Sequence, residues 1–99
     1  MRKVVGMHFV CRDDLNVTDH GNGTFDTGFW AVSHKHCPGL EYVALHASKD
    51  SPSYRQGRVV AWRAVPYAGK ERVIFTVESD NQRRDWVGGG SGERGYAYR

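Results

Sequence analysis

The sequence predicts a mostly β protein, built as a small antiparallel barrel or pseudo-barrel, or as a strongly bent sheet, with one short helix. Short segments alternate between apolar and polar residues, which is typical of strands with one buried face. The 12 glycines, with few Leu and Met, argue against a helical bundle. Closing the sheet would remove the open edges that short β domains must otherwise protect. With 99 residues the chain is expected to form one domain, 1–99.

Five or six segments are expected to be strands. In residues 4–12, the side chains of Val5, Met7, Phe9 and Cys11 point to one side, and those of Val4, His8 and Val10 to the other. The later segments are 28–33, 41–47, 58–65, 71–78 and, as a short closing strand, 96–99.

Turn chemistry separates these segments. Residues 13–27 are rich in Asp, Asn, Gly and Thr and are expected to form a loop of about fifteen residues. Residues 66–70 predict a hairpin turn. The short helix is expected within 50–57, because Ser51 suits its cap, Pro52 its first position and Gly57 the residue after its end.

The charge pattern is compatible with a polyanionic partner. The net charge is +3 and the pI about 9.1. Acidic residues gather in the first third of the chain and basic residues in the middle and at the end, which favours one basic face. The acids are Asp13, Asp14, Asp19 and Asp26, and the bases are Lys49, Arg55, Arg58, Arg63, Arg83, Arg84, Arg94 and Arg99.

No apolar run is long enough to cross a bilayer, and the basic start lacks an apolar stretch of signal-peptide length. We therefore expect a cytoplasmic protein without a membrane partner. In a reducing compartment Cys11 and Cys37 are expected to be free thiols.

Aromatic and basic residues are interleaved, and this is the main functional signal. Aromatic faces hold unpaired bases by stacking, and arginines contact phosphates. The sequence thus predicts a module that binds DNA or RNA, at an unpaired or modified base, with no catalytic residue, metal ion or cofactor. The expected binding residues are Trp30, Tyr54, Arg55, Arg58, Trp62, Arg63, Arg83, Arg84 and Trp86. At least one tryptophan, such as Trp62, is also expected to serve the core, and Tyr54 is expected to be accessible.

Other functions stay open. A small basic ribonuclease could use His46 near Arg55 or Arg58, and a protein-binding accessory or inhibitor protein is compatible with the length and charge. The ligand types of a zinc site occur at His34, His36, Cys37 and His46. Cys37 beside a histidine could be a nucleophile, and the glycine-rich residues 88–92 could cradle a phosphate.

One order of features resembles the PUA-like superfamily, and within it the EVE and ASCH branches. An aromatic-led strand ends in a polar segment (Phe29-Trp30-Ala31-Val32-Ser33-His34-Lys35-His36), and a later glycine opens a strand with small and aromatic residues (Gln56-Gly57-Arg58-Val59-Val60-Ala61-Trp62). The resemblance covers about residues 28–80, in a chain shorter than a typical EVE domain. It implies a pseudo-barrel with a cleft that receives a nucleic-acid base or a related ligand.

Overall fold

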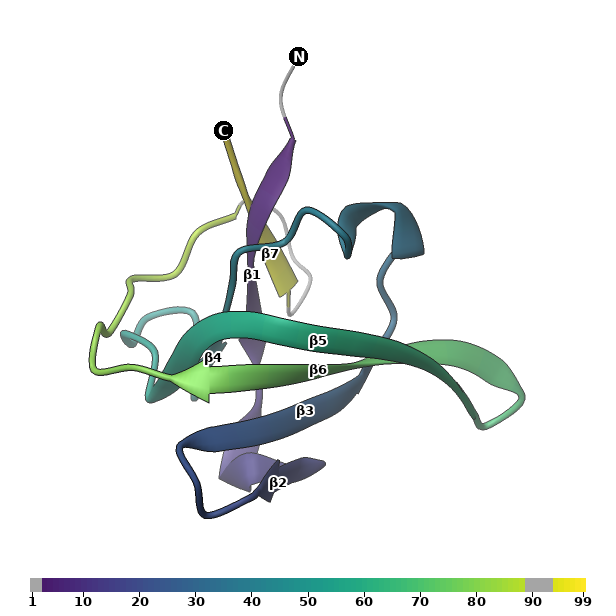
Figure 1. Ribbon diagram of the computed structural model, residues 1–99. Coiled ribbons are helices and arrows are strands. Elements are labelled where there is room, and N and C mark those ends of the chain that lie inside the picture. The colour runs from purple at the N-terminus through teal and green to yellow at the C-terminus, as the bar shows by residue number, and fades with distance from the viewer. Residues whose placement is uncertain (1–2, 89–93) are drawn as a thin grey trace.

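A computed structural model describes residues 3–88 and 94–99, which form one seven-stranded sheet (Figure 1). Its elements are β1 (Val4–Val10), η1 (Arg12–Asp14), β2 (Val17–Asp19), β3 (Thr24–Trp30), η2 (His34–His36), β4 (Tyr42–His46), β5 (Arg55–Tyr67), β6 (Lys70–Ser79) and β7 (Arg94–Tyr98). The strand order is β2-β3-β6-β5-β4-β1-β7. Strands β1 and β4 run parallel, and the other neighbouring pairs are antiparallel. Within the described ranges, no helix has the length and apolar character needed to cross a membrane.

The mostly β prediction is confirmed, but the sheet is mixed and does not close into a barrel. The segment 13–27 is not a plain loop either. Its Asp and Asn residues tolerate positive φ and form the tight turn around η1, after which β2 pairs with β3 and extends the sheet.

The prediction of a short helix within 50–57 is wrong. Long-range backbone hydrogen bonds take over this segment, because the Ser53 N–H donates to the Arg84 carbonyl and the Tyr54 N–H to the Leu45 carbonyl. Strand β5 then begins at Arg55. Local capping signals contribute about 1 kcal/mol each, which these tertiary contacts outweigh.

The sheet is strongly bent. In Figure 1, β1 and β7 run across the direction of β3, β5 and β6. The bend brings Phe9 of β1 onto Trp30 of β3, although three strands separate β1 from β3 in the sheet. Their rings are stacked, with centroids 4.1 Å apart and planes 12° apart. This contact joins β1 and β3 across the bend without a backbone hydrogen-bond ladder between the two strands.

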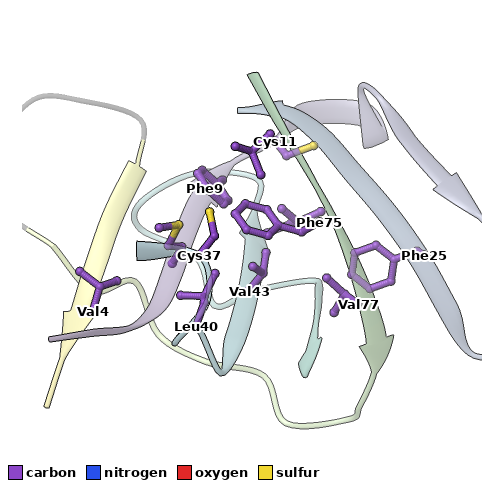
Figure 2. Packing of buried hydrophobic residues seen from close by; sticks show 12 residues of the cluster. Val4, Phe9, Cys11, Phe25, Cys37, Leu40, Val43, Phe75 and Val77 are labelled. Carbon is purple, nitrogen blue, oxygen red and sulfur yellow. The ribbon is translucent and has the colours of Figure 1, made fainter. Parts of the chain in front are cut away.

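The core fills the concave side of this bend (Figure 2). Phe9 and Phe75 lie at its centre, and Phe25 lies toward the β3–β6 side. The other buried members are Val4, Met7, Cys11, Cys37, Leu40, Val43, Leu45, Val73 and Val77. Both cysteines are free and belong to this cluster, and burial raises the pKa of each thiol.

A β-bulge in β3 decides which aromatic side chains enter the core. Phe25 and Thr27 point inward and pair with the inward-facing Val77 and Phe75, so simple alternation would turn residue 29 inward and residue 30 outward. The register shifts between Thr27 and Trp30, and Trp30 pairs with the buried Val73 instead. The bulge therefore sends Trp30 to the core and Phe29 to the convex, outer face.

The close approach of β5 to β6 at Gly57 leaves no room for a side chain. A Cβ atom at Gly57 would overlap the backbone carbonyl of Glu78, which cannot swing away as a flexible side chain could. We predict that Gly57→Ala lowers the free energy of unfolding by about 2 kcal/mol or more, measured by urea denaturation. Gly39→Ala is the matched control, because its added methyl would meet only the Lys3 Nζ atom, at 3.9 Å. Equal stability of the two variants would contradict this packing argument.

Candidate functional site

A groove lies where the sheet stays open, between the end of β1 and β3. It consists of two adjoining hollows of about 320 and 270 Å³ that share Asn16, Gly28 and Phe29. The first is lined further by Val10, Cys11, Arg12, Leu15 and Trp30, and the second by Thr18, Asp26, Arg63 and Ile74. Each hollow is close to the lower end of the size range of small-molecule sites.

The groove combines aromatic, amide and cationic groups. Trp30 and Phe29 form part of its wall, Asn16 offers amide donors and an acceptor, Arg12 lines the first hollow and Arg63 the second. Phe9 covers one face of the Trp30 indole, whose N–H donates to the Thr27 hydroxyl at 3.0 Å. Trp30 is therefore held in place at the boundary between the core and the first hollow.

The wall formed by residues 11–16 is unusual in its backbone. Asp13, Asp14 and Asn16 all have positive φ, at 58°, 52° and 60°. Residues other than glycine adopt this left-handed backbone conformation at an energetic cost, and residues in this conformation cluster at functional sites. This wall of the groove therefore has a backbone conformation that its residues would not prefer in an isolated peptide.

Tyr54, just before β5, and Arg55, its first residue, brace that wall. The Tyr54 hydroxyl donates to the Cys11 carbonyl at 2.6 Å. The Arg55 guanidinium donates two hydrogen bonds to the Asp14 carboxylate, at 3.0 and 3.3 Å, and one to Asp19 at 3.4 Å. Such a two-point ion pair fixes both distance and orientation. Tyr54 and Arg55 therefore shape the groove from behind.

The electrostatics of the second hollow centre on Asp26. Partial burial works against its ionisation, but hydrogen bonds from Thr76 and His20 outweigh this and hold the pKa of the carboxyl below its ordinary value. The carboxylate contacts Arg63 at 3.4 Å, and the Arg63 side chain is 55% exposed. Arg63 thus keeps most of its surface open to a second anionic partner.

A second group of polar side chains lies on the opposite side of β1 and β4 from Phe9 and Val43. Buried His8 contacts His46 (Nδ1 to Nε2, 2.8 Å) and the Tyr42 hydroxyl (Nε2 to Oη, 2.8 Å). Gly6 makes room for the Tyr42 ring, because a Cβ atom there would overlap it. Residues 80–88, here called the strap, cross this face and set Trp86 edge-on to His46, with centroids 5.1 Å apart.

A carbonyl fixes the protons along this histidine chain. The His46 Nδ1 lies 2.8 Å from the Ser51 carbonyl, which accepts only, so this nitrogen must donate. Neutral His46 then accepts at Nε2 from His8, and neutral His8 accepts from the Tyr42 hydroxyl. Burial lowers the pKa of both histidines, that of His8 to about 4, with His46 and Arg84 adding to the effect on His8. The chain is uncharged at neutral pH.

Folding distributes the expected binding residues over four places. Trp30 and Arg63 line the groove, and Tyr54 and Arg55 brace it. Trp62 packs against the core, and Arg58 pairs with Glu78 on the outer face. The fourth place is the strap, where Arg84 stacks over the Tyr42 ring at 4.5 Å, the Arg83 Nε donates to the Ser53 carbonyl, and Trp86 covers the histidine chain.

The charge separation along the chain does not persist in space. Asp14 and Asp19 bind Arg55, and Asp26 binds Arg63, so the acidic first third packs against the basic middle. Sequence reasoning missed Asn16 and Phe29 as site residues. Phe29 carried a signal in its aromatic-led strand, but only the bulge shows that it faces outward. For Asn16 the sequence carried no signal beyond its residue type.

The structure separates the side chains of the alternative sites. His34 contacts Glu71, His36 lies against the Tyr96 ring, and Cys37 is buried in the core. No group of three potential metal-ligating side chains occurs among residues 3–88 and 94–99. His46 is fully buried with both ring nitrogens engaged. The glycine-rich phosphate loop predicted at 88–92 lies, apart from Gly88, outside the described residues.

Comparison with family models, with curated proteins and with solved structures found no match.

The buried histidines predict an acid-sensitive fold. The pKa of His8 is lower in the folded protein than in the unfolded chain, so as the pH falls the unfolded chain takes up a proton before the folded protein does. The contribution of His8 to stability is therefore present above pH 6.5 and is lost as the pH falls toward 4. For His8 alone we predict a loss of about 2 kcal/mol between pH 7 and pH 5, measured by urea denaturation. The window from pH 7 to pH 5 lies above the ordinary pKa values of carboxyl groups, so the loss is assigned to the histidines. His8→Gln should give a shallower decline, and a wild-type stability that does not change over this window would contradict the prediction.

Proposed function

We propose that this protein binds single-stranded nucleic acid, DNA or RNA, and holds an unpaired or modified base in the groove between β1 and β3. The observation that carries the proposal is the pair of adjoining hollows with an aromatic wall and an arginine in each. The resemblance to PUA-like proteins, which rests on sequence alone, points to the same class of ligand.

The aromatic wall supplies the stacking surface. A stacked base contributes about 1–3 kcal/mol, and stacking tolerates any base because every base has a π face. The rigid Trp30, fixed by Phe9 and Thr27, reduces the ordering cost of binding. Asn16 supplies the amide that would hydrogen-bond the base edge and so provide selectivity.

The cations of the groove supply the phosphate contacts. Arg63 already faces Asp26, but an exposed ion pair of this kind is worth only about 0–1 kcal/mol. A phosphate therefore competes readily for, or shares, the Arg63 guanidinium. Counterion release then makes binding weaken as salt rises.

A ribonuclease that uses His46 has less support. A general base must come within hydrogen-bond reach of its proton, and the His46 ring is buried beneath Trp86 with both nitrogens occupied. Incubation of the wild type and of His46→Ala with labelled RNA separates the two functions. The proposal requires RNA that stays intact with both proteins.

Arg63→Gln tests the phosphate contact. We predict weaker binding of a labelled single-stranded oligonucleotide in fluorescence titrations. The slope of log affinity against log salt should also become shallower by about 0.7, the value for one single-strand phosphate contact.

Arg99→Gln is the matched control. Arg99 is 67% exposed, also pairs with one carboxylate (Glu41), and lies beyond β7 at the other edge of the sheet. It should bind with the affinity and salt slope of the wild type. Equal losses in both variants would indicate non-specific charge attraction, and no binding to any single strand at low salt would refute the proposed function.

A further inference from the structure

We infer that Tyr67 is a second stacking platform, and that the protein holds an unstacked single strand of at least two nucleotides across the outer face of β3, β6 and β5. This inference rests on the proposed function and extends it, because it names the form of the ligand and a residue that contacts it.

Tyr67 adjoins the groove through Phe29. Its ring is stacked on Phe29, with centroids 4.4 Å apart and planes 5° apart, and Phe29 belongs to both hollows. Phe29 covers one face of the tyrosine ring, and 46% of Tyr67 is exposed. The free surface of Tyr67 is therefore its other face and its edge.

The position of Tyr67 is rigid. It ends β5 and pairs with Lys70 across a two-residue turn, Ala68–Gly69, in which both residues have positive φ (52° and 78°). Turns of this type match the twist of the strands they join. An aromatic ring held by a tight hairpin and by a stacked neighbour loses little freedom when a base binds.

The charges beside Tyr67 suit a nucleic-acid backbone. Arg63 and Tyr67 are four residues apart on one strand and share the outer face with Ile74, which pairs with Arg63. The strand opposite brings Lys70 next to Tyr67, exposed to solvent. Aromatic rings with cations between and beside them are the usual surface for single strands.

The geometry excludes a stacked double helix as the ligand of both places. Phe29 and Tyr67 together separate the groove from the outer face of Tyr67, and their centroids alone are 4.4 Å apart. Neighbouring bases in a duplex rise by only about 3.4 Å. One strand can reach both the groove and the outer face of Tyr67 only when its bases are splayed apart, and a single strand meets this condition without the loss of base pairs.

The test is a length series on the full chain. Thymidine oligonucleotides of one, two, three, four and six nucleotides, each with the same fluorescent label, are titrated with the wild type, Tyr67→Ala, Tyr67→Phe and Tyr98→Ala. The wild type should gain affinity in a step between one and four nucleotides, by about 5- to 100-fold. Tyr67→Ala should bind the mononucleotide like the wild type and lose the step, and Tyr67→Phe should keep it.

Tyr98→Ala is the matched control, because Tyr98 is 48% exposed but belongs to β7 at the far edge of the sheet. It should behave as the wild type. A Tyr67→Ala protein that binds and keeps the full length-dependent step overturns the inference and leaves the groove proposal standing. Absence of binding at every length, in the wild type and in all variants, overturns the proposed function and this inference with it.

Discussion

The stacked contact between Phe9 and Trp30 joins β1 and β3 across the bend of the curved sheet. These residues belong to strands that are not hydrogen-bonded to each other, so the fold is closed at this point by side chains and not by a ladder. A ladder between β1 and β3 would have filled the gap. Because side chains and not a ladder join these two strands, space remains beside the rings, and this space is the first hollow of the groove. The stability of the core and the opening of the site thus have a common origin.

The bulge in β3 links the same contact to the outer face. By shifting the register between Thr27 and Trp30, it decides which of two consecutive aromatic residues faces the core and which faces outward. Trp30 completes the core, while Phe29 lies between the groove and Tyr67. Bulges often re-aim side chains beside binding sites, and here one residue step separates a structural from a surface role.

The other side of β1 and β4 is built from polar groups. The Ser51 carbonyl fixes the direction of every hydrogen bond from Tyr42 through His8 to His46, and Trp86 covers the two histidines. No buried side-chain nitrogen or oxygen in the described ranges lacks a partner. A fully satisfied network costs little in the neutral state, but protonation of His8 would place a positive charge in a buried site near Arg84. The strap of residues 80–88 therefore contacts a pH-dependent histidine pair through Trp86, while its hydrogen bonds to Ser53 and Gln56 do not depend on pH.

The sequence by itself determined the strand-rich fold, because the period of two in 4–12, 41–47 and 71–78 is a local property of the chain. It also pointed to Trp30 and Arg63, which line the groove, and to Tyr54 and Arg55, which brace it. Only the tertiary structure decided the parallel pairing of β1 with β4, the replacement of the helix near Ser51, and the outward position of Phe29. These features depend on contacts between residues far apart in the chain, such as Ser53 with Arg84 and Trp30 with Phe9. Local propensity is too weak to specify these features. The propensity of one residue for helix or strand is worth about 1 kcal/mol or less, and it is opposed by a whole set of long-range hydrogen bonds and buried ring contacts.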